Sequence, residues 1–499
     1  MVVEVLFFSK SKYTQLWQCP KMLWLDANHR ELRTEDPAVQ ARLSTGNVVG
    51  DLAMELFGDF TEVTVMKNDR PDISAMIQKT RECLAAGVEN ICEASFSYNG
   101  LYCAVDILRA EKGGRAIYEV KSSTHAQEQY GIDIAYQKYV LEKCGVKVTG
   151  TYLVCIDSDY VRGEELDIHQ LFKIVDMSDW VELETPNIPE RLKLAETVLS
   201  GDEPCIGIGE HCSHPYNCAY WQYCSKHLPQ PSVFDVYRLS EQKKWDYYRS
   251  GVVSFPSLTC AAGLNEKQRR QIQFAISDCG THIEKKGIQN FLDTLSYPIY
   301  FLDFETMQLV VPEYPGTKPY QQIPFQYSLH YIEEPGGELK HKEFLGVSGE
   351  DPRRAIAESL CRDIPMHTCV TAYNRAFECA RINELALAFP DLAEHLLNIR
   401  SNIQDLLTPF QSGFYYNRAM GGSFSIKSVL PALYPDDPEL DYHNLEGVHN
   451  GGEAMAIFPM IQHMPKEEQE KARKDLLAYC KLDTLAMVKV WQKLLDAVK

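Results

Sequence analysis

Two carboxylates separated by one residue, Asp303 and Glu305, form the clearest chemical pattern in the sequence. They follow the β-rich run 298–302, which predicts a short buried strand. On a strand, positions i and i+2 point to the same face, so the two carboxylates would lie side by side while Phe304 points away. Adjacent like charges favour a bridging cation, and oxygen ligands suit Mg²⁺ or Mn²⁺. The alternative is a strand end that carries two solvated acids.

Two later segments offer further carboxylates. A β-rich run at 370–374 precedes Glu378, which stands at the start of a helical stretch. Near the C-terminus, Tyr479 and Asp483 are four residues apart in an amphipathic pattern and would share one helix face. Each observation also has a simpler interpretation, because acids are favoured near helix N-termini and tyrosines are often half-buried beside surface acids.

The order Asp-x-Glu, Asn-x-x-x-acid and Tyr-x-x-x-Asp resembles the DnaQ-like (DEDD) exonucleases of the ribonuclease-H fold, in their tyrosine-containing branch. The resemblance implies that two divalent ions are held by four carboxylates, Asp303, Glu305, Glu378 and Asp483. It also implies that Tyr479 helps to position the attacking water, and that cleavage runs 3′→5′. Two such ions generate the nucleophile and stabilise the leaving oxygen of a phosphodiester.

This segment departs from the usual motif at one position, because Glu378 stands where the family has Asp. Asn374 lies four residues before it, as in the motif, and Asp405 is a reserve metal ligand. Lys427 follows the Gly-Gly-Ser segment at 421–423 and could contact the substrate backbone. The same segment could instead be a glycine turn capped by serine before a helix.

The N-terminal half contains a second candidate centre. The run 101–106 predicts a strand that ends on Asp106, and a glycine turn leads to a second strand with Glu119 and Lys121 on one face. Two acids from neighbouring strands can hold a metal, and a nearby lysine can polarise the water or the phosphate. The alternative is an ordinary cross-strand ion pair.

This arrangement resembles the PD-(D/E)xK nucleases, most closely the RecB-like branch that includes AddB and the CRISPR-associated four-cysteine exonucleases. That branch carries a glutamine on a downstream helix, which matches Gln137. It usually has a metal-binding histidine on an upstream helix. The corresponding stretch here, 46–55, has no histidine, and Asp51 or Glu55 are the candidates to replace it.

Four cysteines resemble the iron–sulfur site of the same branch, with one early and three late in the N-terminal half: Cys19, Cys212, Cys218 and Cys224. The resemblance implies a [4Fe–4S] cluster, with zinc as the alternative. The interval between the first two late cysteines is longer than usual, and Cys205 is an alternative ligand. Unrelated buried cysteines are the remaining interpretation.

These sites need elements to position them, and the chain of 499 residues is too long for one compact domain. We divide it into a RecB-like domain at 1–227, a helical connector at 228–296 and a DnaQ-like domain at 297–499. The expected fold class is α/β, with a restriction-endonuclease-like N-terminal domain and a ribonuclease-H-like C-terminal domain. In this order the two domains resemble a little-characterised bacterial family.

Composition limits the classes of function. No apolar run reaches the roughly 20 residues of a membrane span, and no signal peptide is evident, so we expect a cytoplasmic protein without membrane contact. In a reducing compartment, the 16 cysteines are not expected to form disulfides. The net charge of −19 opposes non-specific capture of nucleic acid, although metal-binding acids contribute to it.

We therefore expect a metal-dependent nuclease with two centres, a DNA exonuclease acting on ends or single strands. An RNA 3′→5′ exonuclease is the first alternative, because the DnaQ-like fold serves both substrates. A non-catalytic iron–sulfur scaffold that binds nucleic acid is the second, and a zinc-containing partner-binding protein is the third. The sequence does not identify the protein partners.

Overall fold

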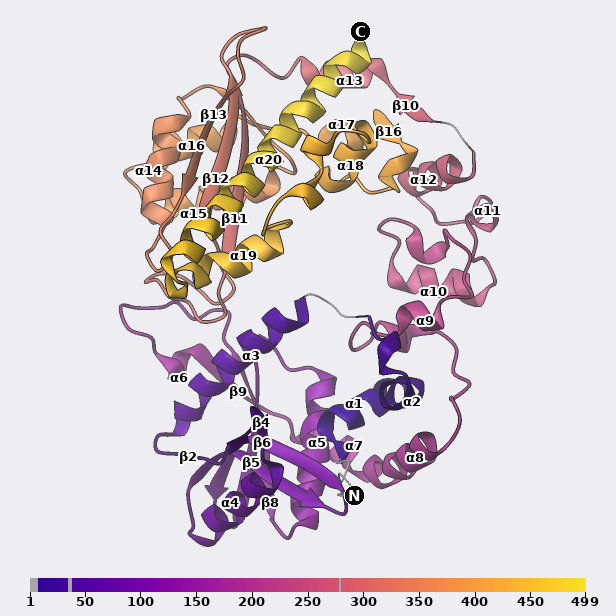
Figure 1. The fold of residues 1–499 in the computed structure, drawn as a ribbon, viewed down its shortest axis with the longest axis vertical. Coiled ribbons are helices and arrows are strands. Elements are labelled where there is room, and N and C mark those ends of the chain that lie inside the picture. The colour runs from indigo at the N-terminus through magenta and orange to yellow at the C-terminus, as the bar shows by residue number, and fades with distance from the viewer. Residues whose placement is uncertain (1–7, 35–37, 278–279) are drawn as a thin grey trace. The chain divides into compact units, whose positions relative to one another are not determined.

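The computed structural model describes residues 8–34, 38–277 and 280–499 of a mixed α/β chain (Figure 1). The chain divides into two compact units. The first unit contains the chain up to His227 together with Leu309–Tyr320, and the second contains Leu228–Gln308 and Gln321–Lys499.

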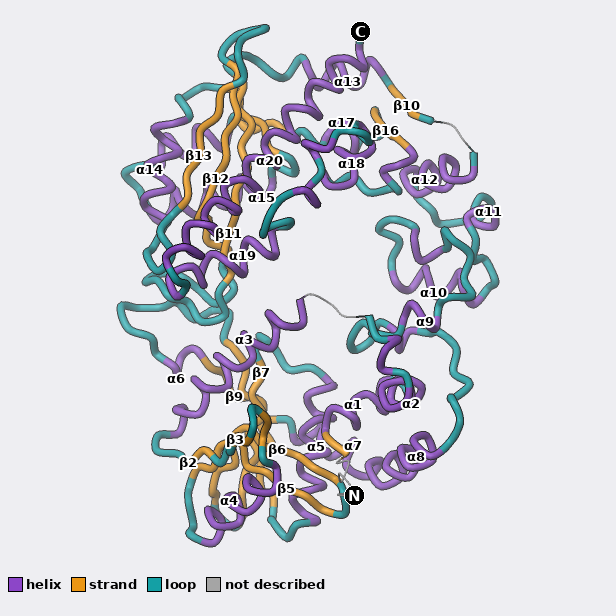
Figure 2. Tube along the Cα trace, in the orientation of Figure 1, coloured by secondary structure: helices purple, strands orange, loops and turns teal. Residues whose placement is uncertain are grey.

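A mixed sheet of seven strands forms the centre of the first unit, in the order β2-β5-β6-β7-β8-β9, with β1 paired to β6 (Figure 2). Its strands are β1 (Phe8–Ser9), β2 (Thr61–Glu62), β5 (Asn90–Tyr98), β6 (Leu101–Glu111), β7 (Gly114–Lys121), β8 (Val148–Ile156) and β9 (Phe172–Asp176); β3 (Met66–Lys67) and β4 (Arg70–Pro71) form a separate hairpin.

The helices of the first unit are α1 (Lys10–Gln18), α2 (Pro20–Asn28), α3 (Ala38–Met54), α4 (Ile73–Ala85), α5 (Glu128–Lys143), α6 (Ile168–Leu171), α7 (Ser178–Glu184), α8 (Ile188–Ser200) and α9 (Trp221–Cys224). Helix α5 connects β7 to β8, which run parallel. Its Ile134 and Val140 are fully buried in the same apolar cluster as Ile117 of β7. The crossover therefore fixes α5 against the strand that carries Glu119 and Lys121.

The loop between β11 and β12 packs with the first unit, although both strands belong to the second. Val310 is buried in a cluster with Val154 and Ile156 of β8. Arg162 donates its backbone N–H to the carbonyl of Thr317 (3.0 Å) and its guanidinium to the carbonyl of Pro312 (2.9 Å). A segment that the sequence assigns to the C-terminal domain is thus part of the first unit's core.

A five-stranded sheet forms the centre of the second unit, in the order β13-β12-β11-β14-β15. Strands β11, β12 and β13 are antiparallel, whereas β11, β14 and β15 run parallel. The strands are β11 (Ile299–Gln308), β12 (Gln322–Ile332), β13 (Lys340–Leu345), β14 (Cys369–Ala372) and β15 (Ile403–Asp405).

The helices of the second unit are α10 (Glu241–Arg249), α11 (Phe255–Leu258), α12 (Glu266–Ile276), α13 (Lys285–Leu292), α14 (Arg353–Asp363), α15 (Ala376–Ala388), α16 (Ala393–Ser401), α17 (Thr408–Gln411), α18 (Ile426–Leu433), α19 (Gly451–Met460) and α20 (Lys466–Val498). The stretch 228–296 contributes α10–α13 and the short strand β10 (Thr281–Ile283), which pairs with β16 (Tyr415–Asn417). The predicted helices of this stretch are present.

Strand β11 is covered on both faces. Leu302 and Phe304 lie in an apolar cluster with Ile382 of α15, and Ile356 and Leu360 of α14 join the same cluster. On the other face the ring of Phe301 lies 5.7 Å from that of Trp491 in α20. Figure 1 shows the long α20 running along this sheet. Asp303 and Glu305, which share the face of Phe301, therefore point toward the side that α20 covers.

Among the described residues, no helix combines the length and the apolar character that a membrane span requires.

The buried face of β11 leads to a stability prediction. Leu302 is fully buried, so Leu302→Ala should lower the free energy of unfolding by about 2–5 kcal/mol. Leu387→Ala is the matched control, because that side chain is 75% exposed and should change stability by less than about 0.5 kcal/mol. Urea denaturation measures both, and equal effects would contradict the assigned core.

Candidate metal centres

Strand β11 delivers the first two acids of the second unit. The predicted strand is confirmed, and it continues through both carboxylates to Gln308. Its pairing with β12 shifts register directly after Glu305, where Thr306 pairs with Pro324. Bulges re-aim side chains and are frequent beside active sites, and a proline is tolerated at one because a ladder hydrogen bond is already lost.

Two helices bring the remaining acids. Helix α15 begins four residues after β14 and places Glu378 in its first turn, with 2% of the residue exposed. Helix α20 carries Tyr479 and Asp483 one turn apart, as predicted, and both are buried. No described residue forms a hydrogen bond with the buried Oε2 of Glu378. A buried carboxylate oxygen without a donor is unfavourable unless a cation approaches it.

Three further side chains surround these acids. The Tyr442 hydroxyl donates to Oδ1 of Asp483 at 2.6 Å. Nζ of Lys427 donates to the Tyr479 hydroxyl at 3.1 Å. The Cys480 thiol lies 4.0 Å from Oδ2 of Asp303, and ligand atoms of Asp303, Glu305 and Cys480 all fall within 4.8 Å of one another.

Burial and mutual repulsion perturb this cluster strongly. Burial, followed by the charges of Asp483 and Glu305, holds the pKa of Asp303 well above its usual range. Burial and Asp483 raise the pKa of Glu305 to about 8. Burial and Asp405 raise the pKa of Glu378 to about 8, although Arg381 opposes the shift. Burial is the first cause of each shift, and the charges of neighbouring acids add to it.

Asp405, the reserve ligand, ends β15 beside Ala372 of β14. Its Oδ1 accepts the backbone N–H groups of Asn374 and Leu407, both at 3.0 Å. Asn374 is exposed and adopts a left-handed φ of 68°, which asparagine tolerates better than most residues. Asp405 thus fixes the turn that leads into α15, and it stands close enough to raise the pKa of Glu378.

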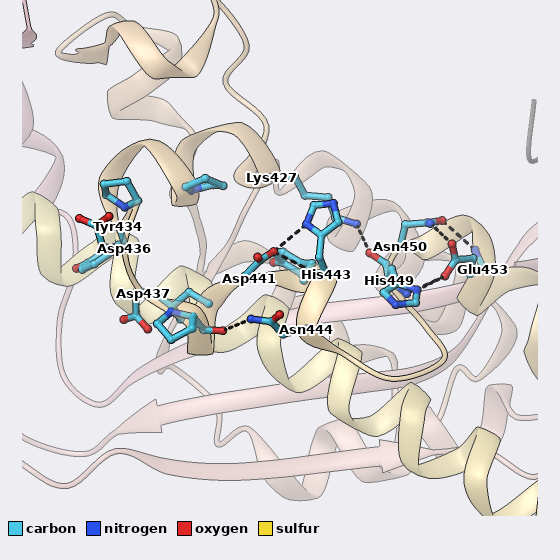
Figure 3. Close-up of a pocket in the computed structure, with 15 residues that line it drawn as sticks. Lys427, Tyr434, Asp436, Asp437, Asp441, His443, Asn444, His449, Asn450 and Glu453 are labelled. Carbon is cyan, nitrogen blue, oxygen red and sulfur yellow. Dashed lines mark hydrogen bonds and ion pairs between the residues drawn. The ribbon is translucent and has the colours of Figure 1, made fainter. Parts of the chain in front are cut away.

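Figure 3 shows the residues that line a cavity of about 910 Å³ in the second unit. Lys427 and Tyr442, which contact Tyr479 and Asp483, are among its lining residues. Lys427 lies in α18, where the structure shows the predicted helix after the Gly-Gly-Ser segment, and Ser425 is its N-cap residue without a side-chain cap bond. A second cavity, of about 500 Å³, is lined by Arg375, Arg400 and Asp405.

The N-terminal candidates also come together. Asp106 lies on β6 and accepts the backbone N–H of Val120 at 2.7 Å, and Glu119 on the neighbouring β7 is fully buried. Nζ of Lys121 contacts Oε1 of Glu119 at 2.7 Å, and Nε2 of Gln137 donates to Oε2 of Glu119 at 2.6 Å. The structure therefore brings the four residues of the second candidate centre into one cluster.

Two residues of this cluster, Lys10 and Asp133, were not predicted from the sequence. Nζ of Lys10 pairs with Oε1 of Glu119 at 2.6 Å, and Asp133 on α5 pairs with Lys121 at 3.2 Å. Burial alone would raise the pKa of Glu119, but Lys10 and Lys121 outweigh it and lower the pKa to about 2. Burial and the charge of Glu119 raise the pKa of Asp106 to about 6.

The proposed replacements for the missing histidine, Asp51 in α3 and Glu55 directly after it, are both exposed.

The four predicted cysteines lie near one another in the first unit, none in a disulfide: Cys19, Cys212, Cys218 and Cys224. Burial raises the pKa of each thiol, and Cys19 and Cys224 contribute further to the shifts of Cys212 and Cys218. Cys205 is exposed. Four cysteine thiolates are a ligand set typical of iron–sulfur clusters and of structural zinc.

A comparison with protein families identifies part of the second unit. Residues 300–425 match a protein family described as a domain of unknown function, DUF2779. The matched segment spans Asp303, Glu305, Glu378 and Asp405 but ends before Lys427, Tyr479 and Asp483. No curated protein matches the chain.

The perturbed acids predict an unusual pH dependence of stability. Because Glu305 has a pKa of about 8 when folded and 4.5 as its reference, the folded state holds a proton that the unfolded state loses between these values. Stability from this group is therefore present below about pH 4.5 and is lost as the pH rises through 8. In EDTA, the melting temperature should fall from pH 6 to pH 8.5.

Glu305→Gln should make that fall smaller, and at pH 8.5 the variant should melt above the wild type. Each pKa unit corresponds to about 1.4 kcal/mol, so the difference should be on the order of a few kcal/mol. Glu394→Gln replaces an exposed acid and is the matched control, with a pH profile like that of the wild type. A wild-type profile for Glu305→Gln would contradict the perturbed state of Glu305.

Proposed function

We propose that the protein is a metal-dependent phosphodiester hydrolase, a nuclease whose main centre lies in the second unit. The observation that carries this proposal is the buried group of four carboxylates, Asp303, Glu305, Glu378 and Asp483. Their pKa values are raised, and Oε2 of Glu378 has no hydrogen-bond partner among the described residues. Both observations indicate too little positive charge around the acids, which divalent cations would supply.

The donor set fits Mg²⁺ or Mn²⁺, because it consists of carboxylate oxygens. Two such ions, when bound, supply a nucleophilic hydroxide and charge compensation at the phosphate. Hydrolysis adds the water oxygen to phosphorus, breaks the bond to the 3′ oxygen and leaves the proton on that oxygen. The Tyr479 hydroxyl, which Lys427 holds at 3.1 Å, orients the attacking water.

The surroundings of the acids favour a single-stranded end as substrate. Lys427 and Tyr442 connect the acids to the cavity of about 910 Å³, a size that suits ligands rather than a duplex. Lys427 supplies a positive charge beside the acids, and Arg375 and Arg400 supply two more in the cavity next to Asp405. The larger cavity also has four acids in its lining, Asp436, Asp437, Asp441 and Glu453, so the positive charge is confined to Lys427 and the arginines.

The sheet topology agrees with the ribonuclease-H-like fold that the motifs imply. Three antiparallel strands continue into two parallel ones, and the two adjacent acids lie on the central strand β11. In the first unit, the mixed sheet with β7-α5-β8 carries a second hydrolytic centre of the PD-(D/E)xK type, formed by Asp106, Glu119, Lys121 and Gln137.

Substitution of one acid tests the main centre. Asp483→Asn keeps the shape of the side chain but removes a charge that a metal needs, so Mn²⁺-dependent cleavage should fall by at least about 100-fold. Asp496→Asn is the matched control on the same helix, because its side chain is 65% exposed and pairs only with Lys499 among the described residues. The assay uses end-labelled single- and double-stranded DNA and RNA.

The cleavage pattern distinguishes the candidate functions. We expect nucleotides to be released from the 3′ end of single-stranded DNA. Faster cleavage of RNA would favour the RNA exonuclease, and undiminished cleavage by Asp483→Asn together with loss in Lys121→Ala would move the activity to the first unit. Absence of cleavage by the wild type with both metals would favour the non-catalytic scaffold.

We further propose a [4Fe–4S] cluster on the four cysteines of the first unit. Anaerobically purified protein should absorb visible light, and dithionite should bleach this absorbance. Cys218→Ser should remove most of it, because it deletes one of four thiolates, whereas Cys205→Ser should leave it unchanged. Colourless protein that contains zinc would show the zinc site instead.

A further inference from the structure

Glu93, which the sequence did not single out, occupies an unusual position next to Asp106. On the antiparallel strands β5 and β6, Cys92 pairs with Ile107 and Ala94 pairs with Val105. Glu93 and Asp106 lie between these two pairs, and burial, followed by the charge of Asp106, raises the pKa of Glu93 to about 7. The backbone of Glu93 has a φ of 57°, in the left-handed region that L-residues rarely adopt within a strand.

The carboxylates around Glu93 outnumber the positively charged side chains. The cluster contains two ammonium groups, Lys10 and Lys121, against four carboxylates, Glu93, Asp106, Glu119 and Asp133. Both lysines form their closest ion pairs with Oε1 of Glu119, at 2.6 and 2.7 Å. Among the described residues, neither lysine forms an ion pair with Glu93 or Asp106. The carboxylates of this cluster therefore outnumber its ammonium groups.

Gln137 provides an independent observation that points to a ligand. Its side chain is fully buried, and Nε2 donates to Glu119, so the amide is directed into the cluster. The other amide atom, Oε1, is buried and has no hydrogen-bond partner among the described residues. A buried carbonyl oxygen without a donor is unfavourable, and a metal ion or its bound water would satisfy it.

We propose that Glu93 and Asp106 bind a divalent cation beside Glu119. The proposal rests on the second centre of the proposed function, but it concerns metal binding and does not depend on cleavage. With oxygen ligands only, the site selects a hard ion such as Mg²⁺ or Mn²⁺ over zinc. A histidine ligand would have favoured transition metals.

Metal-directed cleavage of the polypeptide tests this site in the full-length protein. Fe²⁺ replaces Mn²⁺, and ascorbate with peroxide then generates radicals that cut the backbone close to each bound ion. We expect cuts near residues 93, 106 and 119, and separate cuts near 303 from the main centre. Glu93→Gln should reduce the first group at least tenfold and leave the cuts near 303 unchanged.

Glu89→Gln is the matched control, because Glu89 precedes the same strand, is 66% exposed at its side chain and lies outside the cluster. It should be cut like the wild type. Wild-type cutting in Glu93→Gln would overturn the proposal, and so would absence of cuts near 93–119 in the wild-type protein. Neither result depends on nuclease assays, so failure here is distinguishable from failure of the proposed function.

Glu93→Asn separates a ligand role from a structural one. Asparagine tolerates a left-handed φ better than glutamate, so the variant should melt at the wild-type temperature or above it. It should nevertheless lose the cuts near 93–119, because an amide replaces the carboxylate. A lower melting temperature with the cuts retained would assign Glu93 a purely structural role and overturn the proposal.

Discussion

Electrostatic repulsion between buried carboxylates is the constraint on which the second unit depends. Taking a charged carboxylate out of water is costly, and placing several together adds repulsion to that cost. The fold nevertheless holds Asp303 and Glu305 on one strand face and encloses them with α20, whose Asp483 repels both. Strand, bulge and helix are rigid elements, so the acids cannot relax apart, and their repulsion persists in the folded chain.

The two units balance a comparable cluster in different ways. In the first unit, Lys10 and Lys121 reach Glu119 directly, and its pKa falls to about 2. In the second unit Lys427 contacts Tyr479 rather than an acid, and the pKa of Glu305 rises to about 8. Glu119 of the first cluster is thus compensated by two lysines of the chain, whereas no lysine pairs directly with Glu305 among the described residues of the second.

The sequence was informative where local geometry sufficed. Spacing of two on a strand and of four on a helix placed Asp303 beside Glu305 and Tyr479 beside Asp483, because these periodicities are fixed by the backbone. It could not reveal Lys10, which is 109 residues from Glu119 and reaches it only through the packing of the sheet and α1. Tyr442 was not predicted either, because it is 41 residues from Asp483 and reaches it only in the folded chain.

The sequence did not predict Glu93 as a site residue, because the position of its side chain depends on an irregular backbone conformation. Regular alternation along β5 would treat it as one more strand position, and no glycine or asparagine marks the left-handed φ. The division into sequence-based domains likewise placed a boundary before β11 but gave no sign that the following loop belongs elsewhere. Both are properties of tertiary packing, which local residue patterns do not encode.

The loop 309–320 limits how this protein can be dissected. The chain passes between the two units at three places, not one, since it leaves the second unit after Gln308 and re-enters it at Gln321. A fragment that begins near residue 297 would carry Val310 and Val311 without the apolar residues that cover them. The shorter fragment ending at His227 would lack the same side chains from its core. Point substitutions in the whole chain, rather than truncations, are therefore the means to separate its two centres.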